Sequence, residues 1–223
     1  MIEQKGASEI DVTNELFPNW LIFLMLATIH FLVSLLANEY LFTRELYYSL
    51  FSEQADLIEI DEYVDLIKRF SFWSMITIPM FLLLKYSFIT LLIQIPLLIK
   101  YTEISFRYLF RWVMFASVAL LVGQMIHFIT IYLYADNNIS QKLFKLKPFS
   151  LGRLINSIDY PASTLIVLNQ CSLFEFAWLL ILYIGLLKTG KISKSDGGIL
   201  LLYVWVTLIF LSWFFYFFIP KIL

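Results

Sequence analysis

The hydrophobic positions of the chain fall into long runs that are separated by polar connections. Five runs are apolar enough to form helices in a membrane, at about residues 17–37, 70–99, 106–134, 172–187 and 199–220. A helix of about 20 apolar residues crosses the roughly 30 Å of hydrocarbon in a bilayer. The pattern therefore predicts an all-α integral membrane bundle of five transmembrane helices, with the two chain ends on opposite sides of the membrane.

The second run, residues 70–99, is unusually long and contains Pro79, Lys85 and Pro96. Dividing it would leave two helices of about half the necessary length with no turn between them. We therefore predict one tilted or kinked helix, which places Lys85 near the middle of the membrane. A charge at that depth is costly unless the side chain reaches the interface, pairs with another charge or faces a cavity.

The connection before this run, residues 38–69, is strongly acidic. In its second half Leu57, Ile60, Val64 and Ile67 recur at steps of three and four, which predicts an amphipathic helix with an acidic outer face. The simplest interpretation is a solvated helix lying against the bundle. The alternative is a docking face for a basic partner, formed by Asp56, Glu59, Glu62 and Asp65.

Two further segments are too polar to span a membrane. Residues 1–16 form a short polar N-terminal tail, and residues 17–223 form a single transmembrane domain. Residues 151–169 are interrupted by Arg153, Asn156, Asp159 and Pro161, so we expect a surface-lying or re-entrant linker there.

Composition agrees with a membrane protein and narrows its function. Hydrophobic residues make up 61% of the 223 residues and charged residues 15%, whereas soluble domains are about half apolar and a quarter charged. A net charge of −1 leaves no basic surplus for nucleic acid. The single cysteine, Cys171, excludes an internal disulfide. Lys and Arg are balanced between the two predicted sides, so the positive-inside rule selects neither orientation.

Four ionisable residues in or near the predicted spans form a candidate polar cluster: Lys85, His30, His127 and Glu175. Both histidines and Glu175 are expected toward the side opposite the N-terminus, where they could bind a transition metal or relay protons. Alternatively, each is an interfacial residue bonded to backbone or water. The chain has no HxxxH or HExxH spacing, so we predict no metal site. Lys85 could pair with Glu175 or line a substrate path.

No motif for catalysis is present. Ser, His and Asp lie on separate segments without a nucleophile elbow, and no glycine-rich loop could hold a phosphate. We therefore expect no enzyme activity, no catalytic residue and no cofactor. Gln94, Gln124, Asn169 and Gln170 could form hydrogen bonds between helices, each worth about 0.6–2 kcal/mol.

The segment 148–187 has a distinctive order of residues. The relevant positions are Pro148, Ser150, Leu151, Tyr160, Pro161, Leu168, Asn169, Phe174, Glu175, Trp178, Gly185 and Leu186. This order resembles the Yip-type membrane family, the Ypt/Rab-interacting-protein superfamily with its bacterial relatives. The resemblance implies five spans, a cytoplasmic N-terminus, a role in organising membranes or membrane complexes, and no established enzyme activity. It also implies a bacterial inner (cytoplasmic) membrane as the location.

Two functions follow as expectations. The first is a non-enzymatic scaffold or accessory subunit of a larger assembly, with other membrane or envelope proteins and the lipid bilayer as partners. The alternative is a small transporter or permease component with a polar path through Lys85, His30, His127 and Glu175. A water-lined cavity touching these residues would favour transport, and their separate burial would favour the scaffold.

Overall fold

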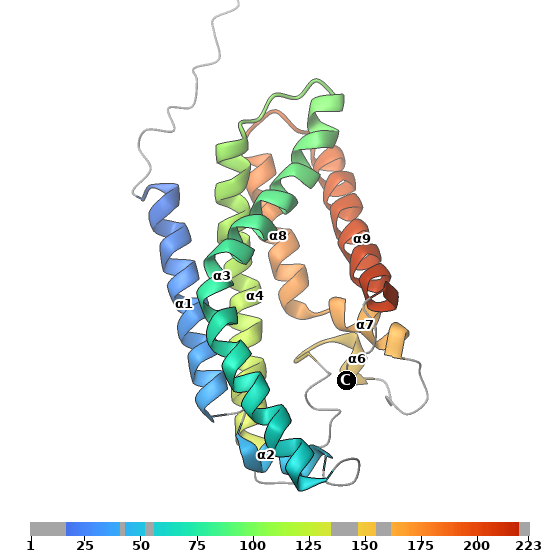
Figure 1. The fold of residues 1–223 in the computed structure, drawn as a ribbon. Helices are drawn as coiled ribbons and strands as arrows, with labels where there is room; N and C mark the ends of the chain where they lie inside the picture. The colour runs from blue at the N-terminus through green and yellow to red at the C-terminus, as the bar shows by residue number, and fades with distance from the viewer. Residues whose placement is uncertain (1–16, 41–42, 52–55, 135–146, 155–161, 219–223) are drawn as a thin grey trace, which may run out of the picture.

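The computed structural model describes residues 17–40, 43–51, 56–134, 147–154 and 162–218. Its elements are helices (Figure 1). Four are long and apolar enough to span a membrane: α1 (Asn19–Tyr40), α3 (Leu57–Ile99), α4 (Phe106–Tyr134) and α9 (Lys194–Phe218). A fifth, α8 (Leu173–Leu187), is apolar but shorter. The predicted all-helical class and the multi-pass membrane character are therefore confirmed.

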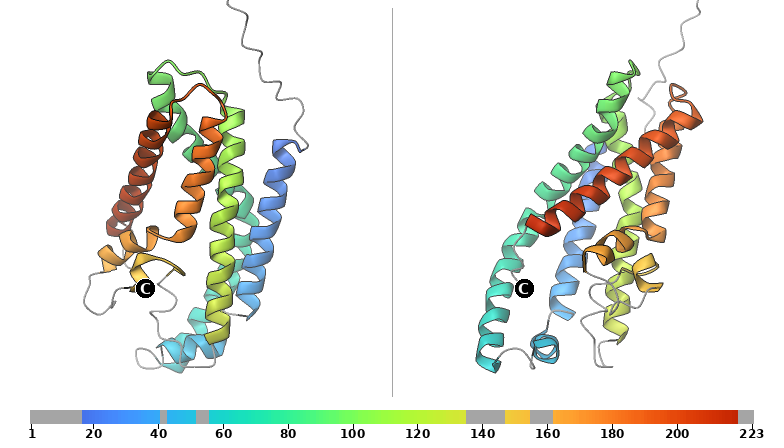
Figure 2. Two further views of the ribbon diagram at one scale, coloured as in Figure 1. Left: turned by 180° about the vertical axis from the view of Figure 1, so that it is seen from behind. Right: turned by 90° about the vertical axis from the view of Figure 1, so that its right-hand side faces the viewer.

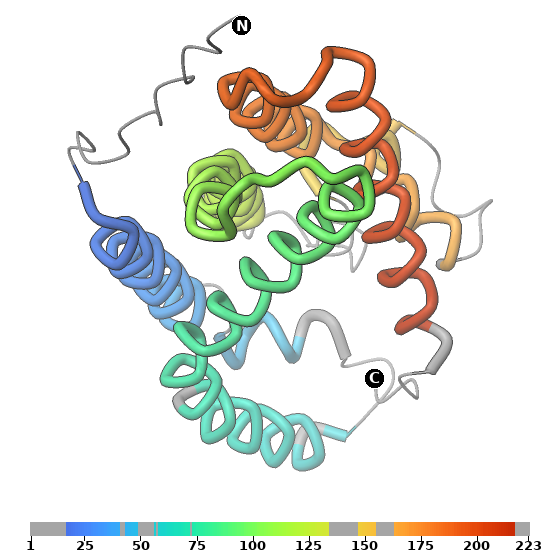
Figure 3. Tube along the Cα trace, turned by 90° about the horizontal axis from the view of Figure 1, so that it is seen from above, coloured from blue at the N-terminus to red at the C-terminus, as the bar shows by residue number. Residues whose placement is uncertain are grey.

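The long helices and α8 alternate in direction along the chain. The start of α1 and the end of α9 therefore lie toward opposite ends of the bundle (Figure 1). Helix α4 contacts α1, α3 and α8, while α9 packs against α3, α7 and α8. The view from above shows α4 between α1 and α8, with α3 crossing the bundle toward α9 (Figure 3). The core is completely buried at Tyr86 of α3, Val113 of α4 and Val204 of α9.

Helices α4 and α8 pack against each other through two contacts, in each of which a glycine of one helix meets an aromatic ring of the other. Gly185 of α8 faces Trp112 of α4, and Gly123 of α4 faces Phe174 in the first turn of α8. The Tyr108 hydroxyl also donates to the carbonyl of Gly185 at 3.0 Å. Small residues let two helices approach within a membrane, so this pair of contacts sets the spacing of α4 and α8.

Helix α3 differs from the prediction at its start. The predicted amphipathic helix and the predicted second span are parts of one continuous helix of 43 residues, within which the apolar segment Trp73–Ile99 agrees with the predicted span 70–99. Ile60, Val64 and Met75 are buried on this helix, with the half-buried Ile67 and Ser71 between Val64 and Met75. At 1.5 Å per residue α3 is about 64 Å long, so it extends well beyond its apolar segment Trp73–Ile99.

The short helix α2 (Arg44–Phe51) packs against the extended end of α3. Arg44 forms ion pairs with Asp65 at 2.7 Å and with Asp61 at 3.3 Å. The Tyr48 hydroxyl donates to Asp61 at 2.6 Å. These contacts hold α2 and α3 together at the end of the bundle where α1 finishes, as both side views in Figure 2 show.

The region before α8 contains two short helices, α6 (Leu151–Leu154) and α7 (Ala162–Gln170), of which α7 packs against α9. The amide of Leu151 donates to the carbonyl of Cys171, and the amide of Leu173 donates to that of Phe149. Part of the predicted linker, including Asn156, lies outside the described residues, as does the N-terminal tail 1–16. Helix α9 begins at Lys194, earlier than predicted, because Ser193 caps it by accepting from the Asp196 amide.

Candidate functional site

The candidate site lies where the start of α8 meets the middle of α3. Lys85 is near the centre of the apolar segment Trp73–Ile99 of α3. Glu175 is in the first turn of α8, and Ser172 caps that helix by accepting from the Glu175 amide at 3.2 Å. Counting along each helix to its far end, at Ile99 and Leu187, both residues are about 20 Å from the same end of the bundle.

Two hollows adjoin at this point and share Lys85, Leu120, Lys147 and Glu175. The first has a volume of about 270 Å³, and its further lining residues are Gly123, Gln124, His127, Pro148, Ser172 and Phe174. The second has a volume of about 280 Å³, and its further lining residues are Phe88, Ile89, Gln170, Trp178, Trp205, Leu208, Ile209 and Ser212. Helices α3, α4, α8 and α9 thus contribute to one polar region inside an apolar bundle.

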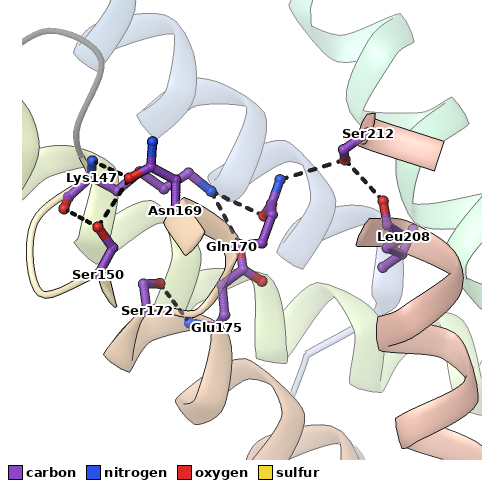
Figure 4. A network of polar contacts seen from close by, with 8 residues as sticks. All are labelled: Lys147, Ser150, Asn169, Gln170, Ser172, Glu175, Leu208 and Ser212. Atoms are coloured by element: carbon purple, nitrogen blue, oxygen red, sulfur yellow. Dashed lines mark hydrogen bonds and ion pairs between the residues drawn. The ribbon is translucent and has the colours of Figure 1, made fainter. Parts of the chain in front are cut away.

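Lys147 is the part of this site that sequence reasoning missed. Its ammonium lies 3.3 Å from Oε1 of Glu175 and 3.2 Å from Oε1 of Gln170 (Figure 4). The Glu175 side chain is largely covered, at 14% exposure, while that of Lys147 is 44% exposed. Lys147 therefore neutralises a mostly buried carboxylate and still reaches the open part of the hollows.

A buried amide holds the backbone that carries Lys147. Asn169 Oδ1 accepts from the Lys147 amide at 3.3 Å and lies 3.1 Å from the Ser150 hydroxyl. That hydroxyl is also 2.8 Å from the carbonyl of Lys147. Gly152 lies close to the Asn169 side chain, since a Cβ at Gly152 would be 2.7 Å from Asn169 Oδ1. The segment before α6 is thereby fixed against the end of α7.

The polar network continues to α9. Gln170 Nε2 is 3.5 Å from the Ser212 hydroxyl, which donates to the carbonyl of Leu208 at 2.9 Å (Figure 4). The sequence-based expectation that Asn169 and Gln170 form hydrogen bonds away from their own helix agrees with these contacts. Gln170 consequently links the ion pair of Lys147 and Glu175 to the wall formed by α9.

Lys85 has a different environment from Lys147. Among the residues that the structure describes, its ammonium forms neither a hydrogen bond nor an ion pair, and the side chain is exposed. It lines both hollows rather than lying in the packed core. A charge at this depth can reach the interface, pair with another charge or face a cavity. Lys85 shows the third arrangement.

The predicted four-residue cluster is brought together in part. His127 lines the first hollow with Lys85 and Glu175. His30 does not line either hollow, and its Nδ1 lies 2.9 Å from the carbonyl of Leu26, one turn earlier in α1. Within the described part of the chain, no three His, Cys, Asp or Glu side chains are grouped as metal ligands would be.

The predicted docking face lies on the first turns of α3 and just before it. Asp65 is engaged by Arg44. The side chains of Asp56, Glu59 and Glu62 are exposed. In the described ranges these three acids form no ion pair, so their negative charge is available to solvent beyond the apolar segment of α3.

Cys171 lies between α7 and α8, next to the site but not among its lining residues. This half-buried position gives no reason to assign the thiol a reactive role.

Comparison with known proteins finds no match. No family model matches the chain, and neither a curated protein nor a solved structure matches it. The resemblance to the Yip-type family stays a prediction.

Proposed function

We propose that this protein is a small transporter or permease component that binds a solute in the hollows between α3, α4, α8 and α9. The observation that carries the proposal is the position of an exposed Lys85 beside the ion pair of Lys147 and Glu175, in hollows lined by the apolar helices α3, α4, α8 and α9. Charged groups at membrane depth are rare and usually line substrate or ion pathways. A scaffold alone would not need them there.

The shortness of α8 supports the same proposal. With 15 residues it is about 22 Å long, less than the hydrocarbon thickness of about 30 Å. In the five-span topology that we propose, α8 crosses the membrane together with the segment carrying α6 and α7. Irregular backbone at membrane depth is tolerated where it is buried in protein or lines a water-filled cavity. The hydrogen bonds of Leu151 and Leu173 satisfy such backbone here.

Access of water to the hollows from both sides of the membrane tests this function without knowledge of the solute. In a Cys171→Ala background, Gln124→Cys is placed in the first hollow and labelled in sealed vesicles with a charged, membrane-impermeant thiol reagent. The reagent is added either outside or inside. Alternating access predicts labelling from both sides, because a transporter must open its site to each side in turn.

A matched control distinguishes water from lipid. Leu84→Cys lies next to Lys85 on α3 and is 57% exposed, but its position does not line the hollows. It should resist a charged reagent from either side. Labelling of Gln124→Cys from one side alone would reject transport and leave a binding site, and no labelling would reject a water-filled hollow.

An accessory-subunit function is the second candidate, and the exposed acids Glu59 and Glu62 favour it. They lie on the part of α3 beyond its apolar segment, where a basic partner could reach them. The Yip-type resemblance supports such a role, in a bacterial inner membrane. Changing Asp56, Glu59 and Glu62 to their amides should release a co-purifying partner in gentle detergent. Unchanged co-purification would count against the docking face.

A further inference from the structure

The charges around the hollows point to the chemistry of the ligand. Resting on the proposed function, we infer that the hollows bind an acidic oxygen group, a phosphate or a carboxylate, carried on an apolar stem. Lys85 and Lys147 supply the positive charge, and the apolar part of the second hollow receives the stem.

The named charges leave an excess of one positive charge. Lys147 forms an ion pair with Glu175, whereas Lys85 forms neither a hydrogen bond nor an ion pair with a described residue. An unpaired ammonium away from bulk water is costly, and an anion placed beside it restores the balance. A cation would meet two ammonium groups and only one carboxylate, which is already engaged. The arrangement therefore favours an anion.

Two hydrogen-bond donors in the wall of the second hollow lack acceptors. The indole N–H groups of Trp178 and Trp205 are buried and have no partner within the described part of the chain. A buried donor without an acceptor lowers stability by about 1–3 kcal/mol. The indoles belong to α8 and α9, and both line the same hollow. An acceptor oxygen of a bound molecule reaches these buried nitrogens once the rings turn toward the hollow.

The remaining wall sets the size and polarity of the stem. Phe88, Ile89, Leu208 and Ile209 make the rest of the second hollow largely apolar. Its volume of about 280 Å³ equals that of roughly nine water molecules in the liquid. A headgroup with a stem of about six carbons fits this volume, and so does the headgroup region of a lipid.

Two sources of the acidic group can be separated by experiment. For a free solute, hexyl phosphate and hexanoate are titrated calorimetrically into the purified, delipidated protein in a neutral detergent. For a lipid, phosphatidylglycerol and phosphatidylcholine are compared by native mass spectrometry. We expect binding of one acidic probe per chain. Hexanol, which has the same stem without the acid, and phosphatidylcholine should not bind.

Charge variants connect the binding to the site. Lys85→Gln should weaken binding of the acidic probe by about tenfold or more, because a charge-assisted hydrogen bond is lost. Lys85→Arg should retain binding. Lys194→Gln, which removes an exposed charge at the start of α9, should stay within about twofold of the unmodified protein. The comparison with hexanol needs no variant and therefore holds even if Lys85→Gln fails to fold.

Three results would overturn the inference: no acidic probe binds, hexanol or phosphatidylcholine binds as tightly, or Lys85→Gln binds as the unmodified protein does. Binding of the hexyl probes supports a free solute, and binding of phosphatidylglycerol alone supports a lipid. Binding combined with one-sided labelling of Gln124→Cys would keep the inference and reject transport. Labelling from both sides without binding of an acidic probe would support transport and reject the inference.

Discussion

Replacement of Gly185 by alanine tests the close packing of α4 and α8. A Cβ at this position would overlap the indole of Trp112, at atoms near its attachment to the backbone rather than at its far edge. The indole or one of the helices must therefore move. Overpacking of this kind typically lowers the free energy of unfolding by about 1–3 kcal/mol, and we expect the upper half of that range.

Alanine also favours helix over glycine by up to about 1 kcal/mol, so the two effects must be separated. Gly198→Ala provides the reference, because Gly198 lies within α9 and a Cβ there meets nothing within 4 Å. The net loss for Gly185→Ala should be about 1–2 kcal/mol. The difference between the two variants should be about 2–3 kcal/mol.

The assay is the apparent Tm of a fluorescent-protein fusion in detergent, read by size exclusion after heating. For a chain of this length, 1 kcal/mol corresponds to about 2–4 °C. Gly185→Ala should therefore lower Tm by about 2–8 °C, while Gly198→Ala should leave it unchanged or raise it by up to about 4 °C. Adding Trp112→Leu should reduce the effect of Gly185→Ala, since contacting residues are not additive. Equal Tm changes for the two glycine variants would refute the packing argument.

Three further tests address other regions. Asn169→Ala removes the acceptor of the Lys147 amide and should lower the free energy of unfolding by about 1–3 kcal/mol in the same assay; an unchanged Tm would contradict its anchoring role. Arg44→Gln removes exposed ion pairs and should lower stability by less than about 1 kcal/mol, a difference that high salt reduces; a larger, salt-independent loss would contradict this. Cys171 is half-buried, so a thiol reagent should alkylate it more slowly in the folded protein than after unfolding; equal rates would contradict the burial.

The spanning helices were predictable because length and hydropathy alone distinguish them. The continuity of α3 from its acidic first turns into its apolar segment was not predictable, because the hydrophobic pattern changes at Arg69 and Phe70. Lys68, Arg69 and Ser71 at that change are also residue types that are found at helix ends, so the local sequence does not indicate continuation. The buried residues Val64 and Met75 lie on either side of the change, with the half-buried Ile67 and Ser71 between them, and the helix runs through it.

The sequence indicates how far along its helix a residue lies, but not which neighbouring helix or hollow its side chain faces. His30 and His127 were both expected toward the same side, yet His127 lines a hollow and His30 meets the carbonyl of Leu26. The face that a residue presents depends on how α1 and α4 rotate against their neighbours. For α4, the contact of Gly185 with Trp112 joins residues 73 positions apart, which no local pattern reports.

Lys147 was hidden for a related reason. It belongs to a polar connection that the pattern assigns to water, and its partner Glu175 is 28 residues later. The polar segment ends at Ser172, which caps the start of α8. This cap places Glu175 in the first turn of the helix, where it meets Lys147. Asn169, just before that cap, fixes the backbone of Lys147. The residues that begin α8 within the bundle thus also gather the charges of the candidate site, so the short helix and the polar hollows have one structural cause.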